Sequence, residues 1–150
     1  MNAAIEFLLG GGGVAAAIHK TTGLKLLKEC QTLNVCPTGE AKITGGYQLP
    51  SKYVIHTVGP VWFGGYSGEA NLLASCYRNS LAIAKNNKLK IIAFPCVSTG
   101  AYGYPFTEAC KIAWKKILDF LEDPRNKLKV ILVTHAQKDF DLYNSILENL

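Results

Sequence analysis

Two stretches of small residues are the part of this sequence whose composition points most directly to chemistry. The first is "LLGGGGVAAAIHK", in which Gly10–Gly13 open into an alanine-rich segment of helical character. The second is "CVSTGAYGYP", Cys96 to Pro105, which follows an apolar segment. Backbone N–H groups in such loops, together with the positive end of a following helix dipole, bind anions. Two loops of this kind predict a site for a ligand with two phosphate groups.

A simple connector is the alternative interpretation of the first loop. Gly10, Gly12 and Ala15 also match a loose dinucleotide-binding pattern, but no clear strand precedes them and no acidic residue follows at the required distance. A Walker loop is excluded, because no Gly-Lys followed by Ser or Thr occurs. The five cysteines contain no C-x-x-C pair, so neither a disulfide framework nor a metal site is predicted. No cofactor is expected.

The elements that position these loops alternate between helix and strand. Apolar spacing predicts helices over 14–22, 24–33, 68–87, 106–123 and 141–150, and strands over 52–59, 90–97 and 128–135. The run 36–47 is interpreted as scaffold, with turn residues that lead into a strand, although its Glu40 and Lys42 have the chemistry of an acid and a base. The pattern predicts one α/β domain over 1–150, a three-layer α/β/α sandwich with a central, mostly parallel mixed sheet. Ligands of such sheets bind beyond the carboxyl ends of the strands.

Charge and composition limit the kinds of ligand that the protein is expected to bind and where it is expected to be located. The formal net charge is +5, and the basic residues are interpreted as scattered along the sequence. Such a distribution favours an anionic ligand but predicts no specific nucleic-acid binding. The apolar runs are too short to cross a bilayer, and the free-cysteine pattern suits a reducing compartment. A cytoplasmic location is expected, with the nucleus as the alternative.

The order of motifs along the chain resembles a known family. "NAA" at 2–4, "LLGGGGV", "AIHK", "CPTGEAKITGGYQLPSKYVIHTVGP" and "VSTGAYGYP" are similar to the macro domain, in the branch that includes the MacroD-type ADP-ribosyl hydrolases. The resemblance implies a diphosphate held between the two loops, the distal ribose against Tyr102 and adenine against His135. It assigns ADP-ribose contacts to Asn2, Ala3, Gly10, Gly11, Gly12, Gly13, Val14, Ser98, Thr99, Gly100, Ala101, Tyr102, Gly103 and His135.

Histidines and a cysteine near these motifs have second interpretations. His135 either stacks on a purine or is a solvated residue at a strand end. His19 stands where MacroD-type enzymes also carry histidine, but helix packing is the preferred interpretation. His56 is interpreted as structural. Cys96 is expected to be a small buried residue and not a nucleophile, because no histidine is placed to activate it.

The resemblance fails at the places that matter for catalysis. MacroD-type enzymes usually carry a second Asn and an Asp that position the ribose or the attacking water; Ile5 and Ala15 occupy these places here. An alkyl side chain cannot hold water or accept a proton, so no catalytic residue is assigned. A module that binds ADP-ribose or mono-ADP-ribosylated protein is therefore the leading hypothesis. A low-activity ADP-ribosyl hydrolase or O-acetyl-ADP-ribose deacetylase is the second, and a degenerate domain without nucleotide function is the third.

The start of the sequence is the other departure. Family members usually begin with an additional strand and a Gly-Asp-Ile-like segment, whereas this sequence begins at Met1 and Asn2. The resemblance thus implies a domain that is truncated at its N-terminus. An open sheet edge can pair with another chain, so an oligomer is a further expectation.

Overall fold

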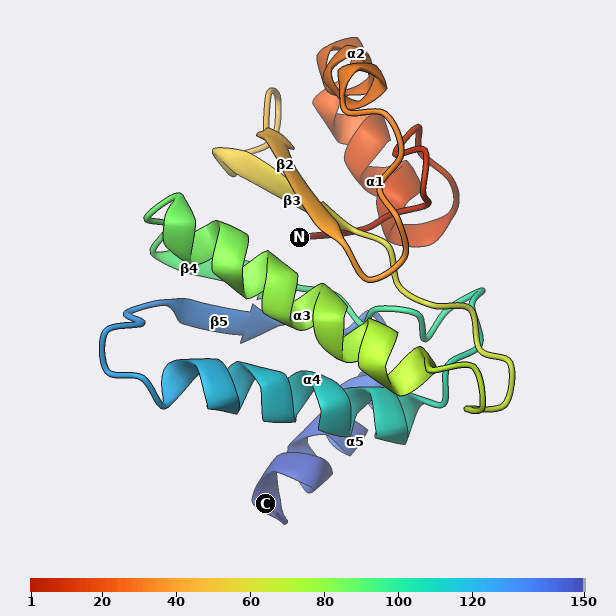
Figure 1. Cartoon of the computed structure of the whole chain (residues 1–150), viewed down its shortest axis with the longest axis vertical. Coiled ribbons are helices and arrows are strands. Elements are labelled where there is room, and N and C mark those ends of the chain that lie inside the picture. Colours follow the sequence, from red (N-terminus) through yellow and green to blue (C-terminus); the bar gives the residue numbers. More distant parts are fainter. Residues whose placement is uncertain (150) are drawn as a thin grey trace.

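The strands form two small sheets that meet at the N-terminal segment, as the computed structural model of residues 1–149 shows (Figure 1). The first sheet has the order β1-β3-β2 and comprises β1 (Asn2–Ala3), β3 (Tyr53–Thr57) and β2 (Ala41–Gly45). β1 runs parallel to β3, and β2 runs antiparallel to it. The second sheet pairs β4 (Ile91–Phe94) with β5 (Lys129–Leu132) in parallel. The Met1 nitrogen donates to the Ala93 carbonyl at 2.7 Å, which places β1 beside β4.

Helices cover the first sheet on both faces. α1 (Gly13–Thr22) and α2 (Leu24–Thr32) lie on one face, where Val58 packs with Leu26 and Cys30. α3 (Glu69–Asn86) lies on the other, where Ile55 packs with Leu73 and Tyr77. α4 (Phe106–Leu121) packs beside α3 and contributes Ala113 and Ile117 to the same core, and α5 (Gln137–Glu148) packs against α4. The arrangement is the α/β sandwich that alternation of elements predicts.

The two sheets differ in how completely they are covered. Ile92 and Phe94 of β4 are buried against α3 and α4, whereas Ile91 is 55% exposed on the opposite face. Ile131, in β5, is also exposed. The continuous apolar sequence predicts strands buried on both faces, but α1 and α2 pack over the first sheet and leave this face of β4 and β5 open.

The segment interpreted as scaffold contains β2 and its turn into β3. Ile43 pairs with Ile55 in an antiparallel ladder, and the turn closes where Gly46 donates its N–H to the Lys52 carbonyl at 2.9 Å. A Cβ on Gly46 would overlap the Ser51 carbonyl, so only glycine fits there. The Lys42 ammonium donates to the Leu33 and Val35 carbonyls. The structure thus engages Lys42 in fixing the α2–β2 connection.

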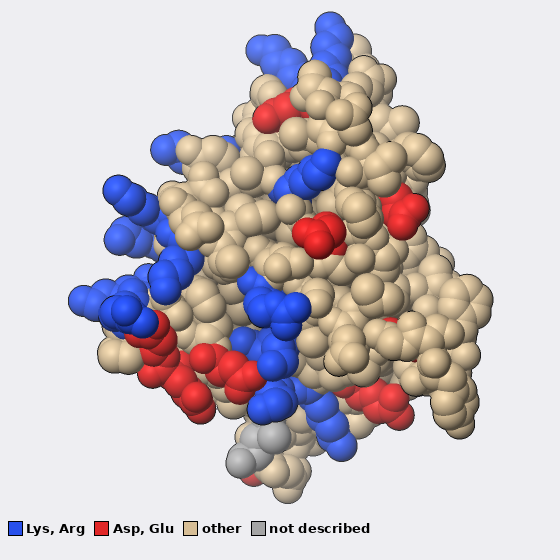
Figure 2. Space-filling model, viewed as in Figure 1, with Lys and Arg blue, Asp and Glu red and all other residues tan. Residues whose placement is uncertain are grey.

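Positive charge gathers where the fold brings two distant turns together. Lysines of the turn before β4 and basic residues of the turn before β5 become neighbours because the two strands pair in parallel. Figure 2 shows Lys and Arg side chains along this edge of the molecule, with a group of acidic side chains below them. Basic residues that form no run in the sequence are therefore brought together in part by the fold. Within residues 1–149, no helix has the length and apolar character that crossing a bilayer requires.

Candidate functional site

A pocket of about 260 Å³ lies at the carboxyl ends of β1, β3 and β4. Its walls come from the residues that directly follow these strands and from the glycine loop before α1. They are Ala3, Ala4, Ile5, Gly12, Gly13, Val14, Ala15, Gly59, Cys96, Val97, Ser98, Gly100, Ala101 and Tyr102. The two small-residue loops of the sequence thus face one cavity, at the edge of the sheet where ligands of α/β folds bind.

The first wall is the glycine loop and the amino end of α1. Gly10, Gly11 and Gly13 have φ angles of 106°, 138° and 55°, which L side chains rarely adopt. Among residues 1–149, no side chain caps α1, and the first turn of this helix contains no acidic residue. The first N–H groups of an α-helix have no intrahelical acceptor, so they are available to a ligand. This end of α1 therefore presents uncapped donors and a positive dipole to the pocket.

The second wall is the loop after β4. Ser98 has a φ of 65°, and its hydroxyl oxygen is buried without a hydrogen-bond partner among residues 1–149. The loop is closed by two backbone bonds of 2.9 Å, from Gly103 to the Gly100 carbonyl and from Tyr104 to the Ser98 carbonyl. The Thr99 hydroxyl donates within the loop, to the Cys96 carbonyl. A Cβ on Gly100 would meet no atom within 4 Å, so the backbone there is open.

Gly59 joins the floor of the pocket to the second loop. A Cβ at this position would overlap Ser98 Oγ and lie 2.6 Å from Val97 Cγ1. Glycine is therefore the residue that lets the end of β3 approach the loop after β4. Sequence reasoning did not select Gly59, although a glycine at the end of a predicted strand, directly before Pro60, indicates a close backbone approach.

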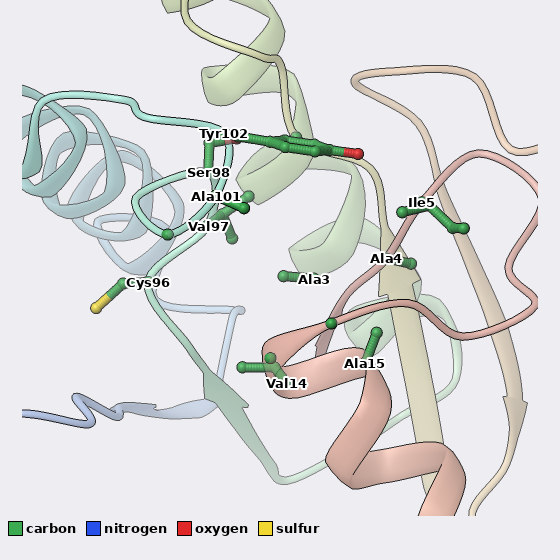
Figure 3. Close-up of a pocket in the computed structure, with 14 residues that line it drawn as sticks. Ala3, Ala4, Ile5, Val14, Ala15, Cys96, Val97, Ser98, Ala101 and Tyr102 are labelled. Carbon is green, nitrogen blue, oxygen red and sulfur yellow. The ribbon is translucent and has the colours of Figure 1, made fainter.

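Tyr102 forms the upper side of the pocket. Figure 3 shows its ring extending across the cavity with the hydroxyl directed toward Ile5, while Val14 and Ala15 lie on the far side. The Tyr102 carbonyl accepts a hydrogen bond of 2.8 Å from the backbone N–H group of Trp62. The Trp62 ring in turn packs against Tyr104, with centroids 4.6 Å apart. The loop after β3 therefore supports the backbone of Tyr102.

Glu69 holds that supporting loop in place. Glu69 is 1% exposed, and its carboxylate accepts hydrogen bonds from the backbone N–H groups of Phe63 at 2.9 Å, Gly65 at 3.1 Å and Ser67 at 2.7 Å. Backbone N–H groups, that of Glu69 itself foremost, hold the pKa of this carboxyl below its usual range. A buried carboxylate thus organises the loop that carries Trp62, a role that the sequence alone did not indicate.

Most residues assigned from the resemblance lie at this pocket, and some lie behind it. Asn2 is fully buried, and its amide nitrogen lies 3.1 Å from His56 Nδ1. His56 Nε2 lies 2.8 Å from the Thr44 hydroxyl, and burial lowers the pKa of His56 to about 4. His56 is therefore neutral at neutral pH: Nδ1 accepts from Asn2 and the Nε2 proton is donated to Thr44. Asn2 and His56 link the two neighbouring strands below the pocket.

The remaining assigned side chains take supporting or outer positions. Among the described residues, Gly10, Gly11, Thr99 and Gly103 belong to the two loops without lining the cavity. The His19 ring lies 3.9 Å from where a Cβ of Gly10 would stand, and burial lowers its pKa. His135 is exposed in the segment between β5 and α5 and does not line the cavity.

Cys96 has the environment of an inert thiol. Burial raises its pKa to about 11, and the thiol donates to the Val133 carbonyl at 3.7 Å. In Figure 3 its sulfur points away from the other labelled residues. Because the thiolate is the nucleophilic form, Cys96 is not activated for attack.

The pocket has a simple chemical character. Its described lining contains no carboxylate, ammonium, guanidinium or imidazole group, and its polar side chains are Ser98, Tyr102 and the thiol of Cys96. Ile5 and Ala15 line it as alkyl groups, so neither can hold a water or take a proton. With no charged side chain in this lining, the groups it offers to an anion are backbone N–H donors, and the rest of its surface is mostly apolar.

Fold and pocket together define an α/β domain whose ligand site is built mainly from backbone. The family model "Macro domain" matches residues 1–113, and the chain belongs to this family.

Relatives and solved structures agree with that membership. The chain is 58% identical over 135 residues to a macro domain-containing protein of Methanosarcina mazei, covering 90% of this chain and 72% of the relative. It is 49% identical to the ADP-ribose glycohydrolase MACROD2 of Xenopus laevis, covering 95% of this chain and 35% of that protein. The Trypanosoma brucei macrodomain in complex with ADP-ribose superposes with a TM-score of 0.91 at 44% identity, covering 97% of this chain and 61% of that chain.

Proposed function

We propose that this protein binds ADP-ribose, free or attached as a single unit to a protein. The observation that carries the proposal is the pocket between the uncapped amino end of α1 and the loop after β4, which offers backbone donors from two sides and no side-chain charge. A diphosphate needs donors on both of its phosphates, and the glycines allow it to approach the backbone closely. The macrodomain of Trypanosoma brucei, similar over 97% of this chain, has been solved with ADP-ribose.

The arrangement of the pocket walls supports one orientation of the ligand. The diphosphate lies between Gly12–Val14 and Ser98–Ala101, and the distal ribose lies under the Tyr102 ring. With this ribose end beside the loop after β3, the attached protein of a modified target leaves the pocket past Phe63 and Tyr66, which are 73% and 96% exposed.

A second candidate function is hydrolysis of the ADP-ribosyl linkage. The relative from Xenopus laevis, named an ADP-ribose glycohydrolase, favours it. The pocket argues for low activity, because no described lining residue supplies a general base at neutral pH. Any hydrolysis would rest on ordered water and on the ligand's own phosphate oxygens.

Calorimetric titration with ADP-ribose tests the proposal, and Gly100 offers a matched pair of variants. Gly100 has no positive φ and open space around it, so Gly100→Gln and Gly100→Glu both fit the free protein. The two side chains have the same size, but only glutamate adds a negative charge where the diphosphate lies. We expect Gly100→Glu to weaken ADP-ribose binding at least tenfold more than Gly100→Gln.

Ala17→Val is the fold control, since Ala17 is exposed on α1 and does not line the pocket. Absence of heat with millimolar ADP-ribose would overturn the proposal and favour a domain without nucleotide function. Equal losses for the glutamine and glutamate variants would contradict the position given to the diphosphate.

A further inference from the structure

A second cavity lies at the opposite end of the smaller sheet, where β4 and β5 begin. It has a volume of about 240 Å³ and lies between the turn that joins α3 to β4 and the turn that joins α4 to β5. Its walls are Lys85, Lys88, Leu89, Lys90, Phe120, Arg125, Asn126, Lys127 and Leu128. We name this cavity the basic cleft. It shares no lining residue with the pocket at the carboxyl ends of the strands.

The basic cleft concentrates the excess charge of the protein. Five of the 16 basic residues line it and no acidic residue does. That number equals the formal net charge of +5, although one of the five, Arg125, is paired with Asp123, which does not line the cleft. A concave surface of one sign focuses the electrostatic field and raises the local concentration of oppositely charged ligands.

The charges converge because of strand pairing. Lys90 directly precedes β4, and its carbonyl accepts the Lys129 N–H at 2.9 Å as the parallel ladder begins. The turn holding Lys88 is thereby placed beside the turn holding Lys127. Only Lys85 lies in the last turn of a helix, where a cation would serve the helix dipole. The other cleft lysines lie outside the helices.

Four of the five cations are available to a ligand. Arg125 is engaged by Asp123, with its guanidinium 2.7 Å from the carboxylate. The lysine ion pairs of the described residues are Lys115 and Lys116 with Asp119, so the four cleft lysines have no carboxylate within ion-pair distance among residues 1–149. All four are exposed.

We propose that the basic cleft binds a ligand that carries several closely spaced phosphate groups. Lysine ammonium groups act as point charges toward phosphate, without the fixed fork of a free guanidinium. The cleft therefore selects ligands by how many phosphate groups they carry close together, and not by a particular geometry of one phosphate. Leu89, Phe120 and Leu128 add an apolar floor beneath the charges. Two sources supply this chemistry: a soluble polyphosphate, or the phosphodiester chain of a nucleic acid.

Fluorescence anisotropy with a labelled 12-nucleotide oligothymidylate, together with competition by tripolyphosphate, tests the proposal. We expect binding at low salt with a slope of about −3 in log Kobs against log salt if four lysines each neutralise a phosphate of a single strand. The variant Lys88→Asn/Lys127→Gln should weaken it at least tenfold. Both positions lie outside the helices and strands, and asparagine tolerates the φ of 55° at Lys88.

The matched control is Lys25→Gln/Lys28→Gln, which removes the same charge from exposed positions of α2 and should change the affinity less than twofold. Effective competition by tripolyphosphate identifies a soluble polyphosphate as a ligand, and binding of the oligonucleotide alone identifies a nucleic-acid backbone. Equal weakening in both double variants, displacement by ADP-ribose, or no binding of either probe at about 50 mM salt would overturn the proposal. ADP-ribose binding by the wild type is measured separately, so failure here leaves the proposed function untouched.

Discussion

The backbone N–H group of Trp62 donates to the carbonyl of Tyr102 at 2.8 Å. The residue that covers the pocket is therefore bound to a loop that precedes α3 in the sequence, whereas Tyr102 itself follows α3 and β4. That loop is itself fixed by three N–H bonds to Glu69. Support for the ligand site therefore runs from a buried carboxylate through Trp62 to Tyr102.

Glu69→Gln should loosen this support. An amide keeps one acceptor oxygen but presents an NH₂ group to an N–H donor that the carboxylate now accepts, so one loop donor loses its partner. We expect the affinity for ADP-ribose to fall by about tenfold. The affinity for ADP should fall less, because ADP lacks the distal ribose that is proposed to lie under Tyr102. Calorimetry with both ligands measures the difference. Glu122→Gln, at an exposed position after α4, is the control; a lowered melting temperature with unchanged affinities would show that the loop does not position Tyr102.

Gly59→Ala should disrupt the junction between β3 and the second loop. The new Cβ would overlap Ser98 Oγ and approach Val97 Cγ1 to 2.6 Å, and overpacking of this kind costs about 1–3 kcal/mol of unfolding free energy. Denaturant unfolding measures the loss. Ser98→Gly removes the overlapping hydroxyl and suits the φ of 65°, so the double variant should recover part of the stability. Strict additivity of the two single changes would contradict the proposed contact.

The buried His56 predicts a pH-dependent stability. Its pKa is about 4 in the folded chain against an ordinary value of 6.5, so the unfolded chain binds more protons between these values. The free energy of unfolding should therefore fall as pH is lowered from 6.5 to 4, by up to about 3 kcal/mol, and stay level in this respect above 6.5. Urea unfolding at several pH values measures the slope. His56→Gln should flatten it, whereas the exposed His135→Gln should not; an unchanged slope in the first variant would assign the effect elsewhere.

Restoring polar groups in the pocket tests the hydrolase alternative. Ile5 and Ala15 line the cavity as alkyl groups, and the family resemblance gives their places to Asn and Asp. An aspartate at position 15 would lie in the first turn of α1, where the helix dipole favours it. We expect Ile5→Asn/Ala15→Asp to raise release of ADP-ribose from a modified protein by about 100-fold, a typical gain from one acid–base group. Equal release by the double variant and the wild type would place the limit on hydrolysis elsewhere.

The order of the helices and strands and the positions of the two loops can be predicted from the sequence, because both depend on local residue patterns. The helices predicted over 14–22, 68–87 and 106–123 are observed as Gly13–Thr22, Glu69–Asn86 and Phe106–Leu121. The predicted diphosphate loops face one pocket because both follow parallel strands.

Features that depend on contacts between distant segments were not accessible in this way. The need for glycine at position 59 arises from Ser98, and the role of Glu69 arises from a loop whose path no periodicity reveals. The basic cleft exists only once β4 pairs with β5. The amide nitrogen of Asn2 lies beside His56, and Asn2 is not among the pocket-lining residues, so its contact with ADP-ribose stays a prediction.

A pocket that grips its ligand through main-chain amides separates two properties under mutation. A side-chain change at a wall position such as 5 or 15 alters the chemical groups that face the pocket, while the amides of Gly13 and Val14 remain in place, since every residue there carries the same N–H group. A domain built in this way can lose the ability to hydrolyse a modification and still bind it, without any change to the backbone of its binding site. The reverse path needs only a few side chains added to walls that already exist.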